Sequence, residues 1–430
     1  MTKKRRVIET LKSLLIAALT CSAIWLAAAS QLFGFLPDMI GSPVRGQGGA
    51  AVGGVRTQAV MPLRMAVISE EGCYAAQYGS GEVESLFNRT ASLLNEALSG
   101  AGLPREVSAR DWEQALLSAP GLYFDFQGDI PLQVLCGWLS GRENANLTDS
   151  ACRLLLSAGS DGEVLLYYTG HGSDRFYACR AQLVSISHLR SAAEDVAANG
   201  AVFACWAADY AQLAADTLIC AQTPEPRVFS AANPLTVEDE ERLADLLNIL
   251  SFPEGITTIY DTPEGRRIRS GNDTLTISRD GLLTLHSAAE DARYPAARTE
   301  GNGDLFAAAE GARALVAEIT RPWRGDAGLY LQQVQQLDAD SWQIRFYYVL
   351  DDTPVQVGQR GYAASVLVER GYITEVELQL RSYTPTEQTV LVLPERQAAA
   401  ALTQINGRGG RLQLCYLDRG DSVQAVWIAQ

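Results

Sequence analysis

The stretch Ile268–Ser287 reads IRSGNDTLTISRDGLLTLHS, and it contains two runs in which apolar and polar residues alternate. Alternation with a period of two is typical of β-strands that bury one face. The charged turn Arg279-Asp280-Gly281 lies between the two runs. Glycine at such a position supplies the positive φ that a tight turn requires. The stretch is therefore predicted to form an antiparallel hairpin.

A second hairpin pattern follows about 90 residues later, in Val355–Tyr383. It has alternating runs around another charged turn that ends in glycine, Glu369–Gly371. Each hairpin is followed by an alanine-rich stretch with helical spacing, at Asp304–Ile319 and at Pro394–Ile405. Repetition of this order predicts two related modules, each with helices packed on one face of an antiparallel sheet.

The part of the chain before the two modules also alternates strand and helix patterns. Strands are predicted at residues 63–68, 122–126, 163–169, 176–184 and 201–206, and helices at 83–98, 109–117, 131–139 and 187–198. A linker with two prolines, Thr223–Pro226, follows. These patterns predict an α+β fold with an N-terminal domain over residues 62–222, a middle module over 223–321 and a C-terminal module over 322–430.

The N-terminus combines a basic segment with a long apolar one. The first twelve residues carry five basic side chains and one acidic side chain, and no charged residue occurs in Ser13–Pro37. The apolar run Leu14–Leu36 would form a helix of about 34 Å, long enough to cross a hydrocarbon core of about 30 Å. Because basic flanks stay in the cytoplasm, a single-pass protein of the cell membrane is predicted. Its parts are a cytoplasmic tail (1–12), a transmembrane helix (13–37), a Gly-rich tether (38–61) and an extracytoplasmic remainder.

Two further interpretations concern the apolar segment. A secretory signal peptide, cleaved at the alanines of 27–29, is the alternative to a retained anchor, although apolar residues continue past that run. Small residues four apart, in the pairs Ala18/Ser22 and Ala23/Ala27, would let a second membrane helix approach closely. These four residues form the candidate partner face of the predicted helix.

The rest of the chain is acidic and contains scattered cysteines. Beyond residue 12 it carries 30 basic and 49 acidic residues, a net charge of −19, which argues against nucleic acid as a partner. Seven cysteines follow the apolar segment without a CxxC pair: Cys73, Cys136, Cys152, Cys179, Cys205, Cys220 and Cys415. A zinc site or disulfide framework is not expected, and most of the seven should be small buried apolar residues. Whether two of them form one incidental disulfide is left open.

One pattern could carry catalysis. The apolar strand pattern at 163–169 ends just before His171, and a later apolar strand ends at Cys205. If both strands lay side by side in a parallel sheet, His171 could take the thiol proton of Cys205, as in caspase-like cysteine peptidases. The opposing interpretation is a turn histidine and a core cysteine, because the surroundings of Cys205 are apolar. The dyad is the alternative reading, and no catalytic residue is assigned.

No metal site and no cofactor is predicted. His188 and His286 are far from His171 in the sequence, so the three histidines have no metal-ligand spacing. The carboxylate pair Asp351-Asp352 is expected to be a solvated turn.

The order of these segments resembles that of the YycH/YycI-type regulatory proteins of Gram-positive bacteria. The shared features are a basic N-terminus, one membrane span, an exported α+β domain and two tandem modules. The passages that carry the resemblance are Val228–Leu235, Leu246–Ser287 and Tyr347–Tyr383.

The resemblance implies an accessory regulator without catalytic residues. Such a protein binds and modulates a sensor histidine kinase of a two-component system through its membrane helix and exported domains. A paralogous accessory protein is a second candidate partner. The alternatives are the surface cysteine peptidase and an envelope scaffold without a signalling role.

Overall fold

The computed structural model describes residues 61–78, 81–194, 196–236, 239–253, 255–288, 293–296, 304–406 and 410–429. They belong to the compact unit Arg56–Gln430. Their fold is α+β, as predicted. The predicted tail (1–12), the membrane helix (13–37) with Ala18, Ser22, Ala23 and Ala27, and residues 38–60 of the tether lie outside the described residues. None of the helices within the described ranges is long and apolar enough to cross a membrane.

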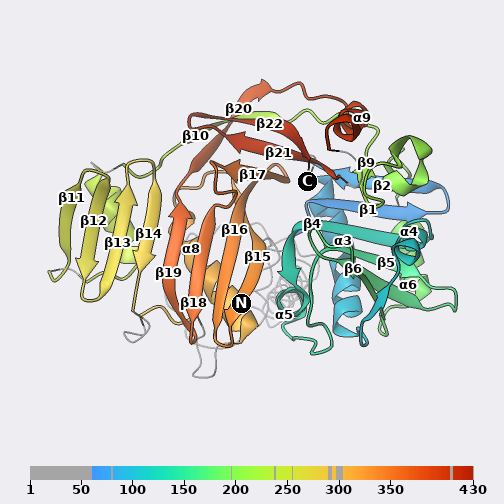
Figure 1. The fold of residues 1–430 in the computed structure, drawn as a ribbon, viewed down its shortest axis with the longest axis horizontal. Helices are drawn as coiled ribbons and strands as arrows, with labels where there is room; N and C mark the ends of the chain where they lie inside the picture. Colours follow the sequence, from blue (N-terminus) through green and yellow to red (C-terminus); the bar gives the residue numbers. More distant parts are fainter. Residues whose placement is uncertain are drawn as a thin grey trace, which may run out of the picture. The chain divides into compact units, whose positions relative to one another are not determined.

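The first sheet has the strand order β2–β1–β4–β5–β6–β7–β3, and every neighbouring pair is antiparallel. Strands β1, β2, β4, β5 and β6 of this sheet are labelled in Figure 1. Its strands are β1 (Arg64–Ser69), β2 (Gly72–Gln77), β3 (Arg105–Val107), β4 (Gly121–Pro131), β5 (Ser150–Ala158), β6 (Val164–Thr169) and β7 (Phe176–Arg180). The strands predicted at 63–68, 122–126 and 163–169 are confirmed, and the strand predicted at 176–184 ends at Arg180. Strands β2, β3 and β5 are additional.

Both faces of the first sheet are buried, which explains why several of its strands are almost entirely apolar. Along β1, Met65 and Val67 belong to one core, whereas Ala66 and Ile68 belong to a second core that contains Trp112. This division follows from the alternation of side chains along a strand. The helices on the two faces are α3 (Glu82–Ser99), α5 (Leu132–Ser140) and α6 (Ile186–Glu194) on the first core, and α4 (Ala109–Leu116) on the second.

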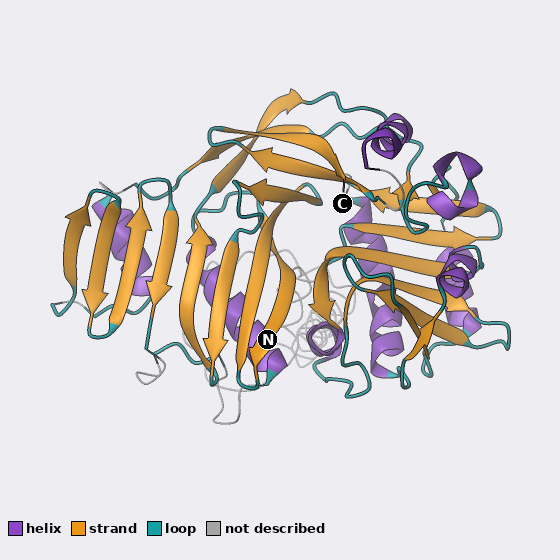
Figure 2. Ribbon diagram, viewed as in Figure 1, coloured by secondary structure: helices purple, strands orange, loops and turns teal. Residues whose placement is uncertain are grey.

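The second sheet has the order β11–β12–β13–β14–β19–β18–β16–β15, again antiparallel throughout. Its strands are β11 (Thr258–Thr262), β12 (Gly265–Ser270), β13 (Asp273–Ser278), β14 (Leu282–His286), β15 (Gly328–Asp338), β16 (Ser341–Leu350), β18 (Ala364–Glu369) and β19 (Tyr372–Gln379). Both predicted hairpin turns are confirmed, with φ of +84° at Gly281 and +82° at Gly371. Figure 2 shows two helices along one face of this sheet, α7 (Glu240–Ile249) and α8 (Leu305–Thr320).

A third group of strands continues from β16 through β17, β21, β22, β10 and β20. Their bounds are β10 (Arg227–Ala232), β17 (Thr353–Val357), β20 (Ser382–Thr389), β21 (Leu412–Asp418) and β22 (Ser422–Ala429), and α9 (Glu395–Asn406) packs on β21 and β22. The β17–β21 pair is parallel, and the other pairs in this group are antiparallel.

Strand pairing crosses the predicted module boundary at residues 321/322. Strand β14 pairs with β19, and α8 packs on β15, β16, β18 and β19. The stretches 223–321 and 322–430 therefore share one sheet, and the division into three domains remains a prediction. The predicted strand at 201–206 is shorter than expected: only β8 (Val202–Phe203) is extended, and a 3₁₀ turn, η1 (Ala204–Trp206), follows it.

Candidate functional site

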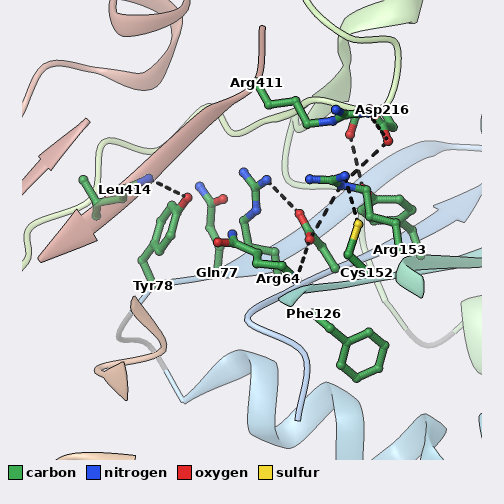
Figure 3. A network of polar contacts seen from close by, with 12 residues as sticks. Arg64, Gln77, Tyr78, Phe126, Cys152, Arg153, Asp216, Arg411 and Leu414 are labelled. Atoms are coloured by element: carbon green, nitrogen blue, oxygen red, sulfur yellow. Dashed lines mark hydrogen bonds and ion pairs between the residues drawn. The ribbon is translucent and has the colours of Figure 1, made fainter. Parts of the chain in front are cut away.

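Five buried charges and one partly buried charge alternate in sign where the first sheet meets α9 and β21 (Figure 3). In spatial order they are Glu395, Arg64, Asp125, Arg153, Asp216 and Arg411, and we call them the ionic chain. Three guanidinium groups alternate with three carboxylates, so the formal charges of the chain balance.

Strand register places three of these charges, Arg64, Asp125 and Arg153, side by side. Arg64 of β1 lies opposite Asp125 of β4, and Asp125 lies opposite Arg153 of β5. Side chains directly opposite one another on antiparallel strands project from the same face of the sheet. The Nη2 of Arg64 donates to Asp125 Oδ2 at 2.8 Å, and the Nε of Arg153 lies 3.7 Å from Asp125 Oδ1.

Both ends of the ionic chain reach the C-terminal part of the sequence. Asp216, just before β9 (Leu218–Ile219), lies 3.7 Å from the Nε of Arg153 and accepts a hydrogen bond from the Nε of Arg411 at 3.1 Å. At the other end, the Nη1 of Arg64 lies 4.0 Å from Oε1 of Glu395, the first residue of α9. The ionic chain thus connects the first sheet with α9 and with the residue that precedes β21.

Neutral contacts surround the Glu395 end. The Oε2 of Glu395 accepts hydrogen bonds from the backbone N–H of Cys220 at 2.8 Å and from Nε2 of Gln77 at 3.0 Å. Beside them, the Tyr78 hydroxyl accepts from the backbone N–H of Leu414 at 3.2 Å (Figure 3). The Tyr78 ring also meets Trp427 edge-on, with centroids 6.0 Å apart. These contacts join the end of β2 to β21 and β22.

The two carboxylates next to Arg64 have pKa values shifted in opposite directions, because the nearby arginine charges outweigh burial at Asp125 but not at Glu395. Burial by itself raises the pKa of Asp125, but the charges of Arg153 and Arg64 outweigh it and hold that pKa below its ordinary value. For Glu395, burial dominates over the more distant Arg64 and raises the pKa above its ordinary value. Asp125 is therefore the carboxylate that holds the two arginines, whereas Glu395 remains costly to ionise.

The ionic chain favours one way of docking these segments. Removing two charges from water costs about as much as their attraction returns, so a buried ion pair adds little net stability. Leaving one of its members unpaired is much more costly. Displacing α9 would separate Glu395 from Arg64, and displacing Arg411 would remove the closer of the two guanidinium groups at Asp216, which makes other arrangements of these segments unfavourable.

A pH series on Glu395→Gln tests the cost of the Glu395 charge. Because the pKa of Glu395 is raised in the folded state, the folded chain binds this proton more tightly than the unfolded chain does. Ionisation therefore lowers stability as pH rises from the unfolded pKa through the folded one. We expect wild type to lose stability relative to Glu395→Gln over that window, measured by urea unfolding at pH values from about 4 to 8. A difference between the two proteins that is independent of pH would contradict this assignment, since Asp125 titrates in both.

Sequence reasoning missed all six members of the ionic chain. A signal for three of them exists, because Arg64, Asp125 and Arg153 each interrupt an otherwise apolar strand. A charge within a strand that is buried on both faces must have a partner. Glu395, Asp216 and Arg411 give no such local signal.

The structure does not bring His171 and Cys205 together as the peptidase alternative requires. That alternative assumed neighbouring parallel strands, and this is wrong: β6 pairs antiparallel with β5 and β7, whereas β8 pairs with β9 in a separate two-stranded sheet. His171 is exposed, and its backbone N–H donates to Asp129 Oδ1 at 2.5 Å. Burial raises the pKa of the Cys205 thiol to about 12, which disfavours the thiolate that a nucleophile needs. Among the hydrogen bonds of the described residues, none joins His171 to Cys205.

The seven cysteines beyond the predicted membrane helix are free thiols, and all but Cys205 are buried, which confirms the prediction that most are core residues. Within the described ranges, no three His, Cys, Asp or Glu residues are grouped so that they could hold a metal ion.

Comparison with known proteins identifies a fold. No protein-family model matches the chain, and no curated protein sequence matches it. The crystal structure of YycH from Bacillus subtilis is similar, with a TM-score of 0.51 and 10% sequence identity over 87% of this chain and 94% of that one. A dehydratase studied for the borrelidin and fluvirucin polyketide synthases matches with a TM-score of only 0.14 and 13% identity, over 77% of this chain and 97% of that one, which carries no argument. The resemblance predicted from the sequence is thus confirmed at the level of architecture: the chain has a YycH-type fold.

Proposed function

We propose that this protein is a membrane-anchored, extracytoplasmic accessory regulator that binds and modulates a sensor histidine kinase of a two-component system. The observation that carries the proposal is the YycH-type fold over 87% of the chain. The N-terminal sequence supports it, because a basic tail followed by the uncharged stretch Ser13–Pro37 is typical of a signal anchor. A paralogous accessory protein is the second proposed partner.

The ionic chain suggests how such a regulator would act. It holds the first sheet against α9 and β21, so a partner that touches either side meets surfaces in a defined relation. A regulator of this kind changes a kinase by binding one of its conformations better than the other. The predicted helix face of Ala18, Ser22, Ala23 and Ala27 would supply a second contact within the membrane.

The test is an interaction screen with the full-length chain. We expect it to co-purify with one sensor histidine kinase of the same cell when the two are co-expressed, and to change the phosphorylation of the cognate response regulator. Replacing residues 1–40 by an unrelated single-span anchor should weaken both effects. Replacing only Ala18 and Ala23 by leucine should weaken them as well, because bulky side chains keep helices apart.

The control exchanges Leu14 and Leu15 for isoleucine, which preserves the hydrophobic span. If no kinase co-purifies with the full chain, the proposed function is wrong. If binding and phosphorylation survive the anchor exchange unchanged, the membrane helix has no part in recognition.

A further inference from the structure

A pocket of about 180 Å³ lies where β4 of the first sheet meets β15, β16, β17, β21 and β22. Among the described residues that line it, none is charged. Four of them are glutamines, Gln127, Gln332, Gln356 and Gln413, and part of its wall is apolar, with Tyr347 and Pro354. None of the described residues that line the pocket belongs to the ionic chain. The two are linked through Asp125, which accepts a hydrogen bond from the backbone N–H of Gln127.

The side-chain amide of Gln127, a buried residue of this pocket, has no hydrogen-bond partner among the described residues. Only 8% of the residue is exposed, and neither its Nε2 nor its Oε1 has a partner in the structure. Burying an amide in this way is costly unless a partner is supplied. The residue also has a φ of +61°, a backbone conformation that residues other than glycine adopt infrequently.

The surroundings hold Gln127 in this conformation. Its backbone N–H donates to Asp125 Oδ1 at 3.1 Å, so the ionic chain fixes the residue from one side. On the other side, Gly128 is pressed against the backbone of β15, where a Cβ would lie 2.6 Å from the carbonyl oxygen of Gln332. A strained, unpaired polar residue that its neighbours hold in place is a common feature of binding sites.

A second amide oxygen adds to the unpaired groups of the pocket. The Nε2 of Gln332 donates to the carbonyl oxygen of Gly361 at 3.2 Å, which fixes the orientation of the side chain. Its Oε1 is buried and has no hydrogen-bond partner within the part of the chain that the structure describes. Gln127 and Gln332 therefore hold one buried donor group and two buried acceptor oxygens that have no hydrogen-bond partner among the described residues, on two neighbouring strands whose residues line the pocket.

We propose that this pocket binds a neutral, sugar-sized molecule that carries hydroxyl or acetamido groups. Carboxamides donate and accept at once, which matches hydroxyl and amide groups, and they offer no charge to pair with an ionic ligand. The pocket is smaller than the roughly 300–1,000 Å³ of drug-sized sites, and its apolar wall of Tyr347 and Pro354 suits the non-polar face of a sugar ring.

The position of the pocket gives binding a structural consequence. A ligand that contacts both Gln127 of β4 and Gln332 of β15 touches both sides of the junction between the first and second sheets. It would bind only when the two sides are docked, and it would therefore stabilise the docked state. This inference does not rest on the proposed contact with a kinase.

The experiment measures binding of small neutral probes to the purified full-length chain. N-acetylglucosamine and glucose are titrated by ligand-observed NMR and by thermal unfolding, with glucosamine and glucuronate as charged comparators. We expect saturable, millimolar or tighter binding of at least one neutral probe, with a rise in the unfolding temperature, and weaker binding of the charged comparators.

Three variants test where the probe binds. Gln127→Leu and Gln332→Leu keep the side-chain bulk but remove the amide atoms, and each should weaken binding about tenfold or more. Gln332 lies in β15 at the register shift between Leu331 and Gln333, but unlike Gln127 it has no positive φ, so its variant keeps the test decisive if Gln127→Leu folds poorly. Gln335→Leu is the matched control, because Gln335 is an exposed glutamine of the same strand, and it should leave the affinity unchanged.

Two results would overturn the proposal. One is the absence of saturable binding for both neutral probes, which would mean that the amides of the pocket do not form hydrogen bonds with such ligands. The other is binding that survives Gln127→Leu and Gln332→Leu unchanged, or that favours the charged comparators, since either would place the ligand elsewhere.

Discussion

Replacing Asp125 by asparagine is expected to destabilise the folded chain by about 3–5 kcal/mol, the range measured when one member of a buried ion pair is removed. Asp125 is fully buried and pairs with two arginines, Arg64 at 2.8 Å and Arg153 at 3.7 Å. Asparagine keeps the shape of the side chain but carries no charge. Both guanidinium groups would then be short of negative charge in a region closed to water.

The measurement is urea unfolding of wild type and variant at neutral pH, where Asp125 is ionised in both the folded and the unfolded states. Glu106→Gln is the matched control, since it removes one carboxylate from an exposed ion pair with Arg175 and should hardly change the midpoint. Because Asp125 and Arg64 are in contact, the double variant Asp125→Asn/Arg64→Met should cost less than the sum of the two single variants. An Asp125→Asn protein as stable as Glu106→Gln would contradict this prediction, because it would show that removing the Asp125 charge does not lower the free energy of unfolding.

Replacing Gly128 by alanine is expected to cost about 3 kcal/mol, at the upper end of the usual range for overpacking. A Cβ at this position would lie 2.6 Å from the carbonyl oxygen of Gln332 and 2.7 Å from that of Leu331. Both atoms belong to the backbone of β15, so no side chain can move aside. The added methyl group must push β4 away from β15, and it should loosen the junction and the pocket of Gln127 and Gln332 together.

Thermal and urea unfolding give the size of this effect, and amide hydrogen exchange gives its location. Faster exchange should concentrate in β4 and β15. The control is Gly102→Ala, whose Cβ would meet its nearest neighbour, the Gln182 amide, at an ordinary 3.5 Å. Equal stability of the two alanine variants would contradict the close approach of β4 and β15.

Elements whose signals are local were predictable from the sequence. The turn glycines Gly281 and Gly371 provide the positive φ values that their positions suggest. Ser108 and Asp304 accept hydrogen bonds at the N-termini of α4 and α8, next to the predicted starts of those helices. Periodicity and capping depend on residues within a few positions of one another, so a single sequence contains them.

Edges, strand lengths and pairing partners were harder to predict. The strand predicted at 201–206 ends after Phe203, because its partner β9 has only two residues. The peptidase alternative failed for the same reason, since apolar strands at 163–169 and 201–206 do not reveal whether they are neighbours. Apolar composition shows that a strand is buried but does not identify the strand beside it.

The sequence by itself determined the α+β class, the two charged hairpin turns, the buried cysteines and the resemblance to a YycH-type architecture. Only the tertiary structure decided the ionic chain and the amide pocket. Arg64 and Asp125 are 61 residues apart, and register alone places them opposite each other. Glu395 and Arg411 join them from the far end of the chain, as Gln332 joins Gln127 in the pocket. Buried polar groups obtain their partners by long-range pairing, and that information is distributed over the whole fold rather than contained in any one segment.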